Sequence, residues 1–330
     1  MVEETLDEDM KMGHNRDRVR VSELAYVRLR VPDLDLQTEF LENFGLIRAD
    51  DHDGKIHFRP TDPVHYCYEI EEGPRHFLGF AFHAKSRGDL VVLSRRHGLE
   101  IEPIGGPGGG ERVRLTEPNG YAIDVVFGIE AAAPIEIKRQ VMNTGSDPLV
   151  RKNELFRLQM GKPTPIKRLA HVVLGSPNVS ETVQWFVDTL GMIISDDVRA
   201  GPQREVHVGS FIRIDEGDKF VDHHAVFIIN SPQAGLHHIS FEVPDIDAVL
   251  HDHEYLEKLG KYEHVWGVGR HLLGSQVFDY WADPYGYQHE HWADSDRLDA
   301  NVPSNEWDAP DVMISQWGGH ATERAKQVVA

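Results

Sequence analysis

One segment near the C-terminal end of the sequence concentrates side chains that can bind metal ions or transfer protons. Residues 269–292, GRHLLGSQVFDYWADPYGYQHEHW, contain three histidines, two aspartates and one glutamate. Imidazole and carboxylate groups are common ligands of divalent metals, and the imidazole pKa lies near neutral pH. The segment is therefore either a polar surface loop or part of a metal site, and the residues that could join it decide between the two.

Internal repeats indicate which residues could join it. Residues 23–46 and residues 168–192 each begin with an alternating apolar pattern typical of a strand and pass through Pro-Asp or Pro-Asn. Each then continues as an amphipathic helix that ends near a glycine. Asp33 is the expected helix cap in the first copy, and Asn178 or Ser180 in the second. A third copy covers residues 235–260 and a weaker one covers residues 77–99.

Alternation along the strands brings three side chains to one side of the sheet. In LAHVVL, His171 lies opposite Val172 and Leu174, and in HHISFEV, His238 lies opposite the apolar residues. The two histidines thus occupy the same position in successive modules, and Glu290 in the strand QHEHW can supply a third ligand. Two imidazoles and one carboxylate on one face of a metal leave its other positions open, which suits Fe(II) chemistry with dioxygen.

The first half of the chain lacks the full ligand set. It has Tyr26 at the position of His171, no histidine at the position of His238, and Asp124 at the position of Glu290. We therefore expect one active half and one structural half.

The repeats predict an α+β fold with two domains, each made of paired βαβββ modules that form a half-open barrel around a ligand. The expected boundaries are a mobile arm over residues 1–20, a non-catalytic domain over 21–129, a connector over 130–165, a metal-binding domain over 166–294 and a C-terminal extension over 295–330. We expect this extension to fold over the barrel mouth.

At these residues the chain resembles the type I extradiol ring-cleaving dioxygenases of the vicinal oxygen chelate superfamily, which include catechol and 2,3-dihydroxybiphenyl dioxygenases. The resemblance covers both domains, and its specific motif is carried by Gly269, His271, Tyr280, the Asp283-Pro284-x-Gly286 turn and Glu290. The position before the tyrosine is usually apolar in that family, and here it is Asp279.

The resemblance implies roles for individual residues. His171, His238 and Glu290 would bind Fe(II) or, less often, Mn(II), and His271 and Tyr280 would line the substrate side. A histidine at the start of a strand would act as acid and base; DHHAVF offers His223, favoured by its spacing, and His224 as the fallback. The implied reaction is extradiol cleavage of a catechol by dioxygen to a semialdehyde acid in aromatic catabolism, by a homo-oligomer.

Other interpretations remain open at this point. Another enzyme of the same superfamily, such as a 4-hydroxyphenylpyruvate-type dioxygenase or a glyoxalase, would use the same ligands, and a non-catalytic module could bind aromatic or metal-bound ligands. His237, His289 and His291 are expected opposite the ligands as packing or surface residues. The glycine-rich run over residues 105–110 predicts a hairpin loop, because no Lys-Ser/Thr pair comes after it.

Composition limits the partners. The net charge of −20 over 330 residues works against a nucleic acid or an anionic membrane as the partner. No apolar run approaches the roughly 20 residues that span a bilayer, and the N-terminus is hydrophilic. The single cysteine, Cys67, agrees with a reducing compartment. We therefore expect a cytoplasmic protein with a small-molecule substrate.

Overall fold

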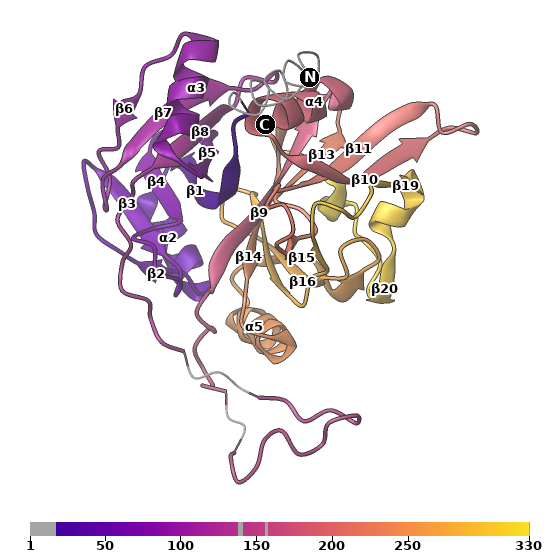
Figure 1. Ribbon diagram of the computed structural model, residues 1–330. Helices are drawn as coiled ribbons and strands as arrows, with labels where there is room; N and C mark the ends of the chain where they lie inside the picture. Colours follow the sequence, from indigo (N-terminus) through magenta and orange to yellow (C-terminus); the bar gives the residue numbers. More distant parts are fainter. Residues whose placement is uncertain (1–17, 138–140, 156–157, 330) are drawn as a thin grey trace, which may run out of the picture.

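In the part of the chain that the structure describes, two large mixed β-sheets, one two-stranded sheet and four α-helices make up the fold (Figure 1). A computed structural model describes residues 18–137, 141–155 and 158–329. Most of the predicted arm therefore lies outside the described residues. Its last residues pack against the rest of the chain, because Val19 is 1 % exposed and the guanidinium of Arg18 donates to Asp215 over 2.6 Å.

The first domain is an eight-stranded sheet in the order β2-β3-β4-β1-β5-β8-β7-β6. Strands β1 and β5 pair antiparallel at its centre, and each has a parallel neighbour, β4 or β8. The glycine-rich run connects β6 and β7, which pair antiparallel as the predicted hairpin. The strands are β1 (Val21–Val31), β2 (Ile47–Arg48), β3 (Lys55–Arg59), β4 (Tyr68–Glu72), β5 (His76–Ala84), β6 (Glu102–Pro103), β7 (Glu111–Thr116) and β8 (Ala122–Phe127).

The second domain repeats this plan in a ten-stranded sheet, in the order β19-β10-β11-β13-β9-β14-β17-β16-β15-β20. Its central pair, β9 and β14, corresponds to β1 and β5, so the predicted paired-module α+β fold is confirmed. The strands are β9 (Arg168–Ser176), β10 (Ile193–Ala200), β11 (Val206–Arg213), β13 (Val226–Asn230), β14 (Gly235–Glu242), β15 (Glu263–His271), β16 (Val277–Ala282), β17 (Gln288–Ala293), β19 (Asn305–Asp308) and β20 (Ser315–Gly318).

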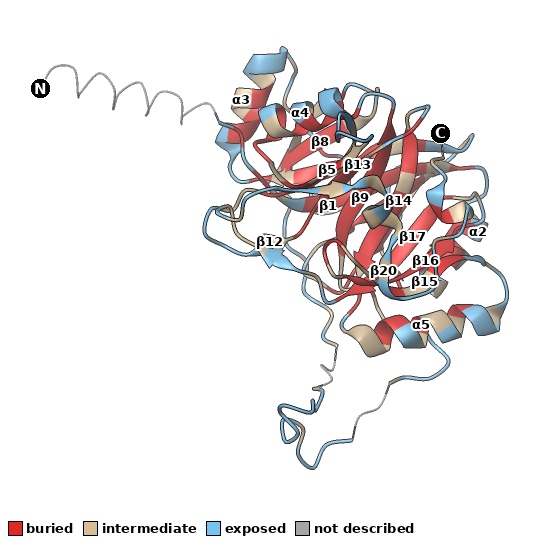
Figure 2. Cartoon of the chain, turned by 90° about the vertical axis from the view of Figure 1, so that its right-hand side faces the viewer, coloured by how far each residue is buried: buried red, intermediate tan, exposed pale blue. Residues whose placement is uncertain are grey.

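Each repeat carries one helix that begins at a side-chain cap. The helices are α2 (Leu34–Asn43), α3 (Arg87–His97), α4 (Val179–Leu190) and α5 (Ile246–Leu259). Their caps are Asp33, Ser86, Asn178 and Asp245, and each cap accepts hydrogen bonds from backbone amides of the first turn. Each helix buries one face, while its other face stays exposed (Figure 2). The predicted strand-cap-helix plan is thus confirmed in all four copies.

The C-terminal extension is part of the second domain. β19 pairs with β10, β20 pairs with β15, and the short strand β18 (Arg297–Leu298) pairs with β12 (Val221–Asp222). Between β19 and β20 lies a 3-10 turn, η1 (Ala309–Met313). The extension therefore adds a strand to each edge of the ten-stranded sheet.

The connector between the sheets has no helix or strand at residues 128–137, 141–155 and 158–167. In the described part of the chain no helix is both long and apolar enough to cross a membrane. Cys67 is buried and free.

The face of β17 opposite Glu290 packs against the first domain. His289 and His291 are fully buried, which confirms the expected packing role. The His291 ring stacks on Phe44, the C-cap residue of α2, at 3.7 Å, and the His289 Nε2 atom lies 3.0 Å from the Tyr68 hydroxyl oxygen. Burial lowers the pKa of His289 to about 3, so this ring is neutral at physiological pH.

Removing this interdomain ring should destabilise the whole molecule. We expect His289→Ala to lower the free energy of unfolding by about 3 kcal/mol, because a buried ring is replaced by a cavity. Tyr68→Phe removes only one buried hydroxyl and should lower it by about 1 kcal/mol. Urea unfolding at pH 7 measures both, and equal losses from the two variants would contradict the packing role of the ring.

Candidate metal centre

Three side chains converge in the second domain. His171 on β9, His238 on β14 and Glu290 on β17 are buried, and their donor atoms lie within 4.8 Å of one another. The His171 and His238 Nε2 atoms are 3.3 Å apart, and the Glu290 Oε2 atom lies 3.0 Å from the first and 3.6 Å from the second. The structure thus brings together the three residues that the repeats selected.

Strand register positions these side chains. Ser240 of β14 is the cross-strand partner of both His171 on β9 and Glu290 on β17. Its hydroxyl donates to Glu290 Oε2 over 2.5 Å, which fixes the carboxylate. The turn before β17 is closed by Gly286 N donating to Asp283 O, and Gly286 has φ +87°, so the predicted turn that aims Glu290 is present.

The donor set fits a divalent metal. Two ligands at right angles, each about 2.1 Å from an ion, lie about 3.0 Å apart, close to the three separations here. One buried atom of the set, His171 Nδ1, has no hydrogen-bond partner. Iron and manganese both accept this combination of imidazole and carboxylate.

Protonation also favours metal binding. Burial alone would raise the pKa of Glu290, but hydrogen bonds from His171 and His271 outweigh it and hold that pKa well below its usual value. Burial lowers the pKa of His238 well below its usual value. At neutral pH the site therefore offers one carboxylate and an unprotonated His238, the forms that coordinate metals.

His271 and Tyr280 lie together beside this centre. The His271 Nε2 atom is 3.0 Å from the Tyr280 hydroxyl oxygen and 3.5 Å from Glu290 Oε1. Burial, together with the charge of Glu290, raises the pKa of Tyr280 well above its usual value. Tyr280 is therefore a phenol that can donate a hydrogen bond to a ligand oxygen.

The structure places only one of the two candidate acid-base histidines at the cavity. The sequence favoured His223, but the ring that lines the cavity is His224, whose centroid is 4.2 Å from that of His171. His223 turns the other way, with Nε2 at 2.8 Å from Asp196 Oδ2. The two residues precede β13 and point in different directions, so counting residues could not decide between them.

His237 also departs from the prediction. Simple alternation put it on the face opposite His238, yet it lines the same cavity. Leu236 pairs with Leu174 and His238 with Val173, so His237 is the extra residue of a β-bulge. The bulge interrupts the alternation, and the Nδ1 atoms of His237 and His238 lie 2.7 Å apart.

The rest of the cavity wall is mostly apolar, with Gln276 as a polar exception. Phe211 and Phe227 stack at 3.9 Å on one side, and Val312 and Met313 of η1 contribute from the C-terminal extension, which therefore covers the cavity as expected. No lysine or arginine occurs among the described lining residues. The full set is His171, Val173, Phe211, His224, Phe227, Ile229, His237, His238, Trp266, His271, Leu273, Gln276, Tyr280, Val312, Met313 and Ala325.

Comparisons with known proteins agree with this geometry. Residues 168–290 match the model of the Glyoxalase/Bleomycin resistance protein/Dioxygenase superfamily. These residues form a domain of that superfamily. The chain is 28 % identical to Metapyrocatechase 2 of Cupriavidus necator over 315 residues, which cover 93 % of this chain and 92 % of the relative. It is 23 % identical to the manganese-dependent 2,3-dihydroxybiphenyl 1,2-dioxygenase of Geobacillus genomosp. 3, covering 80 % and 82 % of the two chains.

Solved structures show the same fold across both domains. Homoprotocatechuate 2,3-dioxygenase from Brevibacterium fuscum, in an anaerobic complex with 3,4-dihydroxyphenylacetate, superimposes with a TM-score of 0.77 at 17 % identity, covering 94 % of this chain and 93 % of that one. The Mn(II)-bound glyoxalase from Novosphingobium aromaticivorans has a TM-score of 0.74 at 24 % identity, covering 93 % and 94 %.

The first domain lacks the candidate ligand set of the second domain and places arginines beside those positions. Register equates Tyr26 with His171, Gly79 with His238, and Asp124 with Glu290. Arg28 and Arg114 stand at the positions of Val173 and Tyr280.

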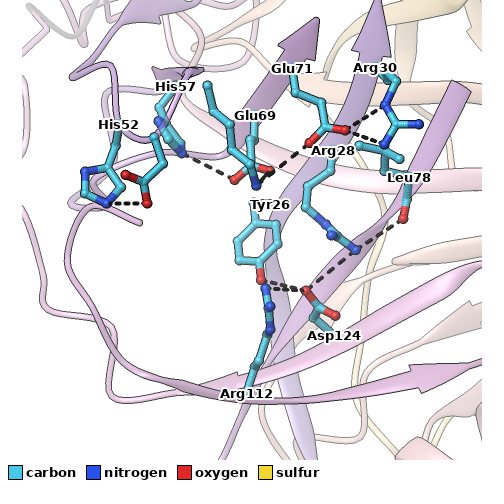
Figure 3. A network of polar contacts seen from close by, with 12 residues as sticks. Tyr26, Arg28, Arg30, His52, His57, Glu69, Glu71, Leu78, Arg112 and Asp124 are labelled. Carbon is cyan, nitrogen blue, oxygen red and sulfur yellow. Dashed lines mark hydrogen bonds and ion pairs between the residues drawn. The ribbon is translucent and has the colours of Figure 1, made fainter. Parts of the chain in front are cut away.

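These arginines surround the buried carboxylate of Asp124. Arg114 donates two hydrogen bonds to it, at 2.7 and 2.9 Å, and the Tyr26 hydroxyl donates another at 2.9 Å. Arg28 and Arg112 approach it to 3.6 Å (Figure 3). Guanidinium groups thus neutralise this carboxylate, and no metal is needed there.

Burial alone would raise the pKa of Asp124, but the hydrogen bonds of Arg114 and the charges around it lower that pKa. We therefore expect Asp124→Asn to lower the free energy of unfolding at pH 7 by about 3 kcal/mol without changing metal content. Because the folded pKa is the lower one, this stabilisation is present above the unfolded pKa of about 4 and is lost as the pH falls below it.

Urea unfolding at pH 7 and at pH 3, with metal analysis of the same samples, tests this expectation. Glu102→Gln is the matched control, since it removes an exposed partner of Arg112 and should change stability by under about 0.5 kcal/mol. A difference between wild type and Asp124→Asn that is the same at both pH values would contradict the assignment.

Proposed function

We propose that this protein cleaves the ring of a catechol with dioxygen in the extradiol manner, at a mononuclear Fe(II) centre held by His171, His238 and Glu290. Mn(II) would fit the same donors. The observation that carries the proposal is the facial arrangement of these three ligands against a cavity that also receives His224, His271 and Tyr280. The names of the relatives, metapyrocatechase and 2,3-dihydroxybiphenyl dioxygenase, support the same reaction class.

His171, His238 and Glu290 would hold the metal from one side, which would leave the cavity side open to the substrate oxygens and dioxygen. When bound, the metal would lower the pKa of the catechol hydroxyls and bring the two substrates into electronic contact. Glu290 contributes one negative charge to the centre, and Ser240 holds its orientation through a hydrogen bond.

Three side chains at the cavity, His224, Tyr280 and His271, would accept, donate or position protons. His224 is buried, and its pKa is well below the usual value, first through burial and then through the neighbouring histidines. It is therefore a neutral base that can accept a hydroxyl proton and return it later. Tyr280 would donate a hydrogen bond to the ionised substrate oxygen, and His271, 3.0 Å from its hydroxyl, would hold that phenol in place.

The wall of the cavity favours an apolar ring substituent. Phe211, Phe227 and Met313 would contact such a group, and none of the described lining residues could pair with a carboxylate as lysine or arginine would. We therefore infer that alkyl-substituted or aryl-substituted catechols are better substrates than carboxylated ones. The homo-oligomeric state and the cytoplasmic location expected from the sequence stay predictions.

The reaction and the acid-base assignment can be tested together. Fe(II)-loaded enzyme is mixed anaerobically with a catechol and then exposed to air, and both oxygen uptake and the yellow ring-fission product are monitored. We expect His224→Gln to lower kcat about 100-fold or more, because a general acid-base group contributes about that much. His223→Gln, the adjacent control, should lower it about 10-fold, since His223 acts only through its contact with His224.

Several outcomes would oppose the proposal. Oxygen uptake unaffected by His224→Gln would contradict the acid-base assignment. A protein that binds Fe(II) and catechol but never consumes dioxygen would favour the binding module. Turnover of an α-keto thiohemiacetal without ring cleavage would favour the glyoxalase alternative.

The contribution of the C-terminal extension to specificity can be measured separately. Met313→Ala enlarges the cavity wall, so we expect kcat/KM for a bulky aryl catechol to rise about 10-fold relative to that for unsubstituted catechol. Met160→Ala, in the exposed connector, removes the same side chain where it is 86 % exposed and should leave the ratio unchanged. An unchanged ratio in Met313→Ala would contradict the lining role of η1.

A further inference from the structure

A second group of metal-ligand residues lies on the other face of the catalytic strands. Tyr280 of β16 points into the catalytic cavity, and the preceding residue, Asp279, points to the opposite face, toward α5. There it meets His253 of α5 and His264 of β15. Helix α5 packs against β15, β16 and β17, so this cluster lies at the junction of the helix and the sheet.

The distances match those of a metal-binding set. Asp279 Oδ1 lies 3.1 Å from His253 Nδ1 and 2.8 Å from His264 Nε2, and all three donor atoms lie within 4.8 Å of one another. Three ligands about 2.1 Å from one ion have separations of about 3.0 to 3.4 Å when the angles between them lie between 90° and the tetrahedral value. A small movement of the two rings would therefore admit an ion.

The indole of Trp281 holds one oxygen of the Asp279 carboxylate in place. The Trp281 indole N–H donates to Asp279 Oδ2 over 2.5 Å, and its ring lies 4.8 Å from the His264 ring. This bond holds Oδ2, as outer partners do in metal sites, while Oδ1 lies within reach of both imidazoles; His253 Nδ1 is also 3.2 Å from Oδ2. Gly267 makes room for it, since a Cβ atom there would lie 2.7 Å from Asp279 Oδ1.

Exposure gives this cluster an entry path. The side chain of Asp279 is fully buried, whereas those of His253 and His264 are 23 % and 33 % exposed. An ion held by all three would therefore keep coordination positions for water and could exchange with solvent. Glu254 and Glu257 on α5 add negative charge near His253, which favours a cation.

We propose that His253, His264 and Asp279 form a second divalent-cation site, of the borderline class that prefers imidazole, with Zn²⁺ as the probe ion. Three protein ligands with one or more waters is a common zinc arrangement. Binding joins α5 to β15 and β16, the two strands that also carry His271 and Tyr280. The site uses none of the catalytic ligands, so it does not depend on the proposed activity.

The experiment measures zinc binding to the full-length, Fe(II)-loaded protein under anaerobic conditions, by equilibrium dialysis and elemental analysis. We expect one Zn²⁺ per chain in addition to the iron. His264→Gln and His253→Gln should each weaken this binding by about 100-fold or more, because each removes one of three ligands. Added Zn²⁺ should raise the Tm of the wild type and of neither variant.

Two controls keep the result specific. His251→Gln removes an imidazole from the same helix outside the cluster and should bind Zn²⁺ as the wild type does. Glu290→Gln, which impairs the catalytic centre, should retain the additional Zn²⁺, and Co²⁺ added to it should give visible absorption bands that His264→Gln abolishes.

The proposal is overturned if wild type takes up no Zn²⁺ beyond the catalytic equivalent. It is also overturned if the His253 and His264 variants bind Zn²⁺ like wild type. Either result would identify the cluster as a hydrogen-bonded contact between helix and sheet. Loss of iron with retention of the His264-dependent zinc would count against the proposed catalytic centre alone.

Discussion

The register of three adjacent strands is the constraint on which the candidate centre depends. Ser240 of β14 pairs with His171 on one side and with Glu290 on the other, so a single residue of the central strand aligns two ligands and bonds to one of them. Side chains alternate between the two faces of a strand, so a slip of one residue would turn a ligand toward the helix side of the sheet. The packing of His289 and His291 against α2 opposes such a slip, because their rings fill the interdomain core from the same strand.

The two domains each bury a negatively charged carboxylate, and they differ in the positive charge available to compensate it. Each buries a carboxylate at the equivalent point of its sheet, Glu290 or Asp124, and a buried charge needs a compensating one. In the first domain arginines of the chain itself supply that charge, and in the second we propose that a metal ion held by His171, His238 and Glu290 supplies it.

Sequence reasoning succeeded where strands are regular and failed where they are not. His171, His238 and Glu290 lie in continuous ladders, so counting by two located them correctly. His237 belongs to a bulge and His224 to the segment before β13, and in neither case does alternation fix the direction of a side chain. The pairing of β19 and β20 with distant strands could not be predicted either, because their sequences carry no signal for a partner.

Strands β15 and β16 contribute side chains to the cavity on one face of the sheet and to the His253–His264–Asp279 cluster on the other. Asp279 and Tyr280 are consecutive residues, one bonded to His253 and His264 and the other beside His271 and Glu290, and Trp266 of β15 stacks on Tyr280 at 5.6 Å. A change in the distances between His253, His264 and Asp279 must therefore be accommodated by a movement of α5, of the two imidazole rings or of β16. The two imidazoles are partly exposed, whereas β16 is buried on both faces, so we expect β16 to move least and Tyr280 to keep its position.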